Sequence, residues 1–307
     1  MKKLNYRLLF SILILLFATS NNSWAFLEFD FSNNLVPLKE LKRGGVPKDG
    51  IPAILMPEIV TAEEAKEFMN DSDRIMSLSV NGEHRAYPIK ILNWHELVND
   101  RLGDRDVLVS FCPLCGTGLV FERNIGDEAL IFGVSGLLYN SDLLFYDDKT
   151  DSLWSQIEGK AITGKFSGKK LKLLPSLHTS WEYWKNLHPD TTVALPELGY
   201  MNSYDANEYE EYNKSKELYF KVSKRDPRFH PKERVIGTRL NGVAKAYFFS
   251  KLNELSSPVK DTLGGEKIMV HYDKKSSTAY ITDMTGNVLE SIVGFWFAWY
   301  AFNSDTL

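Results

Sequence analysis

The residues of this 307-residue chain best suited to chemistry are its only two cysteines, Cys112 and Cys115. They lie in the stretch Cys-Pro-Leu-Cys-Gly, a spacing that lets both sulfur atoms converge on one point. Gly116 can adopt a positive φ angle, which would fold the loop back into a knuckle. A disulfide across so short a loop would restrict the unfolded chain very little, so the pair is poorly explained as a stabilising bridge. Metal binding through thiolates and thiol–disulfide exchange both remain open.

The segments around the pair favour a metal site. We predict strands over residues 107–111 and 119–123, whereas in thioredoxin-like proteins the first cysteine opens a helix. A closed structural zinc site normally needs four protein ligands, and the chain has no second cysteine pair. Two thiolates with one imidazole would suit Cu(I), or zinc with an open coordination position.

His95 is the histidine we expect to be the third ligand. It lies on a helix predicted over residues 89–99, on the apolar face that carries Ile91, Leu92 and Val98. A core histidine with satisfied hydrogen bonds is the competing interpretation. The other histidines are better explained as structural residues.

An internal repeat supports the grouping of these three residues. Residues 75–87 read IMSLSVNGEHRAY, and residues 235–247 read VIGTRLNGVAKAY. The similarity continues downstream, and each copy is predicted to end in a helix that carries tryptophan. The second copy has Leu255, Asp273 and Ser276 at the positions equivalent to His95, Cys112 and Cys115. If His95, Cys112 and Cys115 form one site, a copy that keeps only the fold should lose all three residues together, and the second copy has lost all three.

Several polar or aromatic side chains near these motifs could support such a site or line its pocket. Turn capping or ordinary core packing explains some of them equally well. The candidates are Asn99, Ser110, Tyr139, Asn140, Ser141, Asp142 and Trp154.

The predicted fold is α+β: β-rich, mainly antiparallel hairpins with a few helices, in two diverged repeats. Asn81-Gly82 indicates a hairpin turn between strands at 75–80 and 84–87. Helices are expected at 62–69, where Thr61 and Glu64 form a capping box, and at 177–187. We expect a signal peptide over residues 1–25, a loop-rich segment with a short helix over 26–74, the first repeat, with the two cysteines, over 75–200, and the second, degenerate repeat over 201–307.

The first residues predict export from the cytoplasm. Lys2, Lys3 and Arg7 precede an apolar run over residues 8–18, and Ser23-Trp24-Ala25 offers a cleavage site before Phe26. The run is about half the roughly twenty residues needed to span a bilayer. We therefore expect a periplasmic or extracellular protein with no stable membrane span after cleavage.

Charge and motifs exclude some partners. Cleavage would take the formal charge from −4 to −7 by removing three positive charges, so no global field favours nucleic acid. No phosphate-binding glycine loop, nucleophile elbow or dinucleotide fingerprint is present, and no nucleotide cofactor is expected. The sequence leaves open what the partners are and whether the protein is an enzyme.

Several long motifs resemble one bacterial and archaeal family. They are GGVPKDGIPA (44–53), AYPIKILNWHELVND (86–100), FCPLCGTG (111–118), FGVSGLLYNSDLLFYD (132–147) and SLWSQ (152–156). In this order they are similar to the family known as domain of unknown function 3179, over most of the chain from about Gly44 onward. The resemblance implies an exported location and carries no agreed reaction.

The function we expect is therefore an exported soft-metal-binding protein, with copper as Cu(I), or zinc, held by Cys112, Cys115 and His95. One alternative is a periplasmic thiol–disulfide oxidoreductase in which the two cysteines are catalytic. The other is a module that binds a small ligand or glycan, with incidental cysteines.

Overall fold

The computed structural model describes residues 28–196 and 204–307. The predicted signal peptide lies outside these residues. In the described part, no helix is long and apolar enough to cross a membrane.

Strands dominate the fold, and nearly all of them pair antiparallel. One sheet contains β1 (Leu41–Arg43), β10 (Phe132–Tyr139), β11 (Asp142–Asp147), β12 (Leu153–Ser155) and β13 (Lys160–Ala161) in that order. The largest contains β18 (Val243–Phe248), β17 (Arg234–Leu240), β22 (Ile292–Phe295), β7 (Thr117–Glu122), β6 (Arg105–Cys112) and β5 (Leu97–Leu102), with β14 (Lys172–Leu174) also on β7. A third contains β15 (Ser176–Ser180), β3 (Arg74–Val80), β4 (Glu83–Pro88), β16 (Thr192–Leu195) and β2 (Glu58–Thr61). The smaller sheets are β19 (Val259–Leu263), β20 (Glu266–Asp273) and β21 (Thr278–Asp283), and the pair β8 (Asn124–Ile125) and β9 (Glu128–Ala129).

The helices among the described residues are short. They are α2 (Ile89–His95), α3 (Trp181–Leu187), α4 (Glu210–Lys214), α5 (Phe249–Leu252) and α6 (Trp296–Phe302), with 3-10 turns η2 (Leu38–Glu40) and η3 (Glu64–Glu67). This strand-rich arrangement confirms the predicted α+β class.

Three predicted helices are shorter than expected. Over residues 62–69 only the 3-10 turn η3 forms, although the capping box exists: Thr61 N–H donates to Glu64 at 2.7 Å. The helix at 89–99 ends at His95, because Glu96 takes a φ of 57° and the buried Leu97 begins β5. Residues 176–180 form strand β15, and α3 starts only after Ser180, whose side chain accepts a hydrogen bond from the third residue of the helix.

Strand registers show the two repeats. In the first copy Arg74 pairs with Ser180, and in the second Arg234 pairs with Phe295. The hairpin that ends in Cys112↔Thr117 has its counterpart in Asp273↔Thr278. The tryptophan helices also correspond, because Trp184 and Trp299 each donate an indole hydrogen bond to a threonine seven residues later, at 2.8 and 3.0 Å.

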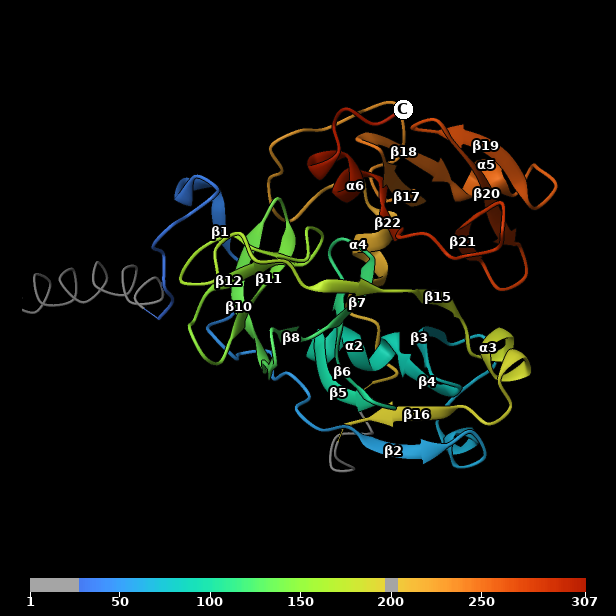
Figure 1. Cartoon of the computed structure of the whole chain (residues 1–307), viewed down its shortest axis with the longest axis horizontal. Helices are drawn as coiled ribbons and strands as arrows, with labels where there is room; N and C mark the ends of the chain where they lie inside the picture. The colour runs from blue at the N-terminus through green and yellow to red at the C-terminus, as the bar shows by residue number, and fades with distance from the viewer. Residues whose placement is uncertain (1–27, 197–203) are drawn as a thin grey trace, which may run out of the picture.

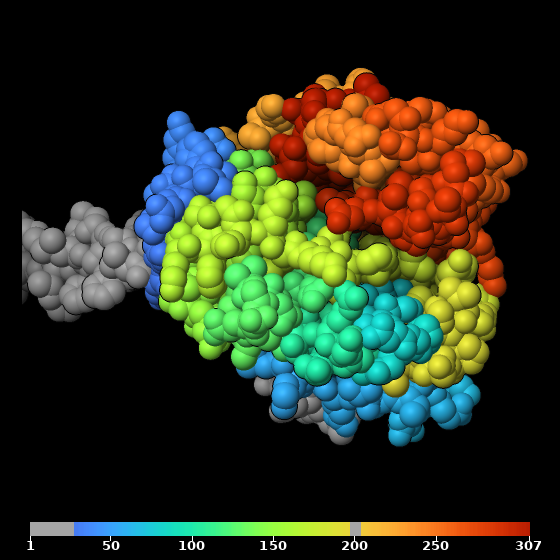
Figure 2. Space-filling view, in the orientation of Figure 1, coloured from blue at the N-terminus to red at the C-terminus, as the bar shows by residue number. Residues whose placement is uncertain are grey.

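An insertion distinguishes the two copies. In the second copy β21 leads to β22 with no strand between them, whereas β8 to β14 lie between β7 and β15 in the first copy. These inserted strands include most of the β1–β10–β11–β12–β13 sheet. Figure 1 shows this sheet beside the first copy, with the second copy, in orange and red, across β7 and β15. The yellow-green chain around β15 fills the seam between the copies in Figure 2.

In each copy an aspartate on the second hairpin (β5–β6 or β19–β20) accepts hydrogen bonds from side chains on the first hairpin (β3–β4 or β17–β18). Asp100 accepts hydrogen bonds from Arg85 at 2.7 Å and from Tyr87 at 2.8 Å. Its counterpart Asp261 accepts from a lysine at 2.6 Å and from Tyr247 at 2.7 Å. The first ion pair is far less accessible, with side-chain exposures of 10% and 6% against 30% and 25%.

This difference predicts unequal costs for the same substitution. Asp100→Ala should lower the free energy of unfolding by about 3–5 kcal/mol, because it leaves the buried Arg85 without its counter-charge. Asp261→Ala should cost about 1 kcal/mol, because its partner stays hydrated. Urea unfolding of both variants measures the difference, and equal losses would contradict it.

Candidate functional site

The cysteine hairpin has the knuckle geometry expected from its sequence. Cys112 ends β6 and pairs with Thr117, which begins β7. Gly116 has a φ of 61°, and a Cβ atom there would lie 3.0 Å from the Phe295 ring. Glycine is therefore required both by the backbone angle and by the space.

Both cysteines are free thiols in a buried position. Cys112 is 1% exposed and Cys115 is fully buried. Burial raises the pKa of both thiols, so in the metal-free protein they carry their protons at neutral pH.

A second turn, from the inserted sheet, closes over the thiols. Asn140 and Ser141 have φ angles of 52° and 66° and join β10 to β11 in a two-residue hairpin. The Ser141 carbonyl accepts hydrogen bonds from the Sγ of Cys115 at 3.2 Å and of Cys112 at 3.9 Å. The hairpin thus brings the first residue of β11 beside the cysteines.

That residue, Asp142, completes a group of three ligand atoms. One carboxylate oxygen and the sulfur atoms of Cys112 and Cys115 all lie within 4.8 Å of one another, and the three residues are buried. Oδ2 accepts a hydrogen bond from the Ile157 N–H at 3.1 Å, whereas the buried Oδ1 has no hydrogen-bond partner. Burial raises the pKa of Asp142 to about 8.

His95, the expected third ligand, is not in this group. Its Nδ1 lies 2.8 Å from the Pro52 carbonyl and its Nε2 lies 2.7 Å from the Tyr204 hydroxyl. Both ring nitrogens are therefore engaged in the described structure. Asp142, predicted only as a supporting residue, occupies the place beside the sulfurs.

The sequence reasoning missed Glu96, which follows His95. It is 9% exposed, and burial together with the nearby Asp142 raises its pKa to about 8. Its φ of 57° and ψ of −35° are unusual for a residue other than glycine. Such backbone strain concentrates at functional sites. The sequence feature that could have identified Glu96 is its position as an acidic residue between an apolar helix and the apolar start of β5.

The remaining predicted residues lie around the site and mostly serve the scaffold. Asn99 bridges β5 to β10 through both backbone groups of Phe132, at 2.9 and 2.8 Å. Ser110 donates to the Leu119 carbonyl at 2.9 Å. The Trp154 indole donates to Asp147 at 3.0 Å within the core, and Tyr139 packs edge-on against Phe302. The Asn140 side chain accepts from the Ser223 N–H at 2.8 Å.

Two residues that close over the thiols carry buried polar atoms without a hydrogen-bond partner. These atoms are Oδ1 of Asp142 and the hydroxyl of Ser141. Buried polar groups are normally paired, so such atoms indicate a bound species or a functional constraint.

A pocket of about 290 Å³ lies beside the cysteine turn. Leu114, which lies between the two cysteines, forms part of its wall together with Glu96 and Tyr209, whereas Cys112, Cys115 and Asp142 do not line it. The polar, tyrosine-rich segment over residues 204–217 covers this region, because the buried Tyr212 donates its hydroxyl to the Leu114 carbonyl at 3.2 Å.

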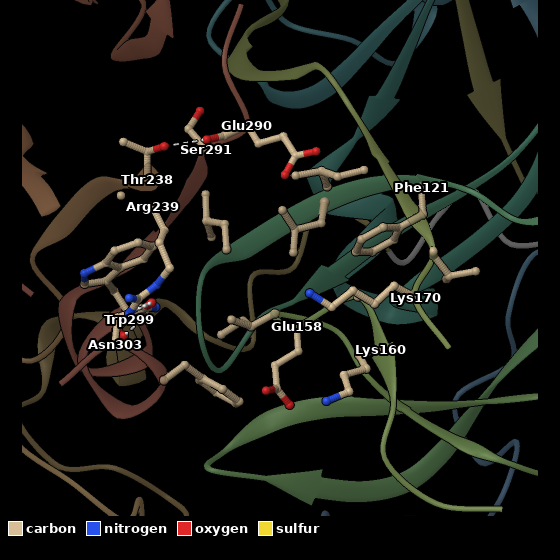
Figure 3. A pocket seen from close by; sticks show the side chains of 18 of the residues that line it. Phe121, Glu158, Lys160, Lys170, Thr238, Arg239, Glu290, Ser291, Trp299 and Asn303 are labelled. Atoms are coloured by element: carbon tan, nitrogen blue, oxygen red, sulfur yellow. Dashed lines mark hydrogen bonds between the residues drawn. The ribbon is translucent and has the colours of Figure 1, made fainter. Parts of the chain in front are cut away.

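A larger cavity of about 460 Å³ lies between the two copies, away from the thiols. Aromatic residues from both copies, Phe121 and Trp299, line it together with charged side chains of both signs, among them Lys160, Glu158 and Arg239 (Figure 3). The predicted alternative of a ligand-binding module would use this space, and none of the three clustered ligand residues lines it.

Comparison with known proteins gives a family and no reaction. No curated protein and no solved structure matches the chain. The family profile described as "Protein of unknown function (DUF3179)" matches residues 48–306, which is nearly the whole chain and includes the cysteine hairpin. The chain therefore belongs to the DUF3179 family.

Proposed function

We propose that the protein is an exported metal-binding protein whose ligands are Cys112, Cys115 and Asp142. The observation that carries the proposal is the convergence of two thiol sulfurs and one carboxylate oxygen within 4.8 Å in a buried position. The unpaired Oδ1 of Asp142 and the unpaired Ser141 hydroxyl beside them support it.

The spacing requires only a small closure. With metal–sulfur bonds of about 2.3 Å, two ligands of a tetrahedral zinc lie about 3.8 Å apart. Side-chain rotations that shorten the present separations by about 1 Å would therefore suffice. Three protein ligands leave one coordination position open, as in zinc sites that bind water or a substrate.

The donor set favours zinc over Cu(I). Two thiolates suit both metals, but a carboxylate is a hard donor that Cu(I) binds poorly. Copper was the sequence-based expectation because His95 was the expected third ligand. With Asp142 in that position, zinc fits the three donors better.

A metal ion would reach the buried site from the pocket beside Leu114. Glu96 lies in the wall of this pocket, and it is near enough to Asp142 for that carboxyl to help raise its pKa.

The redox alternative has less support. A reactive cysteine needs an accessible thiolate with a lowered pKa. Here both thiols are buried and their pKa values are raised, and the neighbouring titratable side chains, Asp142 and Glu96, are carboxyls rather than the basic groups that would lower a thiol pKa.

Metal titration tests the proposal directly. Reduced, metal-free protein should bind one equivalent of Zn²⁺, and Co²⁺ in its place should show thiolate-to-metal charge-transfer absorption. Cys112→Ser with Cys115→Ser should abolish binding, and Asp142→Asn should weaken it at least tenfold by removing an anionic ligand.

His95→Gln is the matched control, because it alters the residue next to Glu96 but no member of the cluster. It should leave zinc affinity within about twofold, with folding checked by circular dichroism. Absence of stoichiometric Zn²⁺ or Cu(I) binding by folded, reduced protein would overturn the proposal. Tighter Cu(I) binding that depends on His95 would restore the original ligand set.

Thiol reactivity separates metal binding from disulfide exchange. In the folded, metal-free protein at pH 7, both thiols should react with an aromatic disulfide reagent at least 100-fold more slowly than after unfolding in guanidinium chloride. The reason is their burial and raised pKa. Fast reaction in the folded state would instead favour the oxidoreductase.

Asp142 should also affect how the stability of the metal-free protein depends on pH. Its folded pKa of about 8 lies above the ordinary aspartate value of 3.8, so between these pH values the folded protein retains a proton that the unfolded chain has released. Stability of the metal-free protein therefore falls as pH rises from about 4 to about 8. Asp142→Asn should flatten part of this slope and be more stable than the parent at pH 7, by a few kcal/mol.

Urea unfolding of both proteins at pH 5 and pH 8, with a chelator present, measures this effect. A variant that is less stable than the parent by the same amount at both pH values would show that Asp142 is an ordinary structural residue.

A further inference from the structure

A second group of unpaired polar side chains lies between the two copies. Arg74 is the first residue of β3, Arg234 is the first residue of β17, and His178 lies in β15, the strand that pairs with β3. The two arginines occupy equivalent positions, since Arg74 pairs with the residue before α3 and Arg234 with the residue before α6. Each copy thus contributes one guanidinium.

The equivalent arginines have diverged in their contacts. Arg74 holds the second copy's turn by donating to the carbonyls of Ser276 and Ser277, and it also donates to the carbonyl of His178 at 2.7 Å. By the repeat, Arg234 would hold the cysteine turn in the same way. It makes no hydrogen bond there, and its guanidinium lies 4.6 Å from the centre of the Phe249 ring.

Buried nitrogen atoms of all three residues lack a hydrogen-bond partner. They are Nε of Arg74, Nη2 of Arg234 and one ring nitrogen, Nδ1, of His178. His178 is only 7% exposed, and an edge-on Phe111 ring packs against it. The group therefore holds buried donor capacity that the described chain does not use.

The positive charge of this group comes from its two arginines and disfavours protonation of His178. Burial and the charge of Arg234 lower the pKa of His178, and the same two causes lower that of Arg74 to about 9. Among the described residues, neither arginine forms an ion pair with an acid. The acidic residues next to them in sequence are engaged elsewhere: Asp73 pairs with Lys90 at 3.1 Å, and Glu233 accepts from the Ser250 N–H at 3.2 Å.

The Tyr272 phenol lies near enough to both guanidiniums to influence their charge. Its neighbour Asp273 is engaged in its own turn, where it accepts from the Ser276 N–H at 2.7 Å. The Tyr272 hydroxyl is therefore a further donor near the guanidiniums, and Asp273 offers them no free carboxylate.

Two adjacent guanidiniums without a counter-charge are costly in a protein interior, and a bound anion removes that cost. The unpaired Nε of Arg74 and Nη2 of Arg234 are charged donors of the kind that bind carboxylate, phosphate and sulfate oxygens. We propose that Arg74, Arg234 and His178 form an oxyanion-binding site between the two repeats.

This site is separate from the cysteines. Phe111, which packs on His178, belongs to the first core cluster, whereas the next residue, Cys112, belongs to the second. Successive strand residues point to opposite faces of a sheet, so the oxyanion site and the thiols lie on opposite sides of β6. Loss of one site therefore need not disturb the other.

Stability measurements in different anions test the site. Unfolding midpoints are measured with phosphate, sulfate, acetate or chloride at constant ionic strength. The parent protein should show saturable stabilisation by at least one of the three oxyanions relative to chloride. Response to acetate alone would assign a carboxylate ligand, and response to phosphate or sulfate would assign a tetrahedral anion.

Arg234→Met should weaken this response at least tenfold in apparent affinity, and in chloride it should be no less stable than the parent, because it removes an uncompensated charge. Arg239→Met is the matched control on the same strand. Its arginine pairs with Asp305 at 2.7 Å on the surface, so the variant should keep the parent's anion response.

Should Arg234→Met not fold, Arg234→Lys serves instead. It keeps the charge but lacks the paired N–H donors, so it should still lose at least fivefold in apparent affinity. Equal midpoints in all anions, stabilisation that never saturates, or an unchanged response in the Arg234 variant would overturn the proposal.

Discussion

The hydrogen bonding of β7 to β22 is the contact on which the rest of the molecule depends. It joins the two copies into one sheet, with Val293 opposite Gly118, and it continues at the turn, where the Phe295 N–H donates to the Cys115 carbonyl at 2.8 Å. A Cβ atom on Gly118 would lie 2.2 Å from the Met76 sulfur, so this junction leaves no space for a larger residue. The cysteine turn is therefore fixed by both copies at once.

Around this rigid turn the protein places groups that reduce its own stability. Two carboxyls have pKa values near 8 because they are buried, and Glu96 and Ser141 adopt positive φ angles without being glycine. Each feature costs free energy, and the structure supplies no compensating bond for several of the atoms concerned. A scaffold under selection for stability alone would replace them, whereas a binding site must keep them.

The structural features that were predicted correctly from the sequence are those that depend on the local spacing of residues. The Asn81-Gly82 hairpin, the knuckle at Gly116, the paired copies and the tryptophan helices all follow from patterns within a few residues or from the repeat itself. Helix lengths were overestimated where an apolar stretch changes from helix to strand, as at Glu96, because periodicity alone cannot locate such a change.

The residue beside the two sulfur atoms could not be found in this way. His95 and Asp142 are both polar residues near apolar segments, and only the pairing of distant strands decides which one meets the sulfurs. Asp142 reaches them because the β10–β11 hairpin folds over a turn about thirty residues earlier in the chain.

The duplication explains why the candidate site lies in the first copy, whereas the equivalent turn of the second copy is structural. In the second copy Asp273 accepts hydrogen bonds from both the N–H and the hydroxyl of Ser276, at 2.7 and 2.6 Å, so the equivalent turn satisfies itself. The backbone carbonyls of this turn then accept hydrogen bonds from Arg74, which belongs to the first copy, so the two copies are linked here. In the first copy the two thiols of the turn donate to the Ser141 carbonyl of the inserted segment instead, and the next residue, Asp142, lies beside them. Because the insertion occurs in one copy only, the repeat could keep its fold while a single copy acquired the means to bind a ligand.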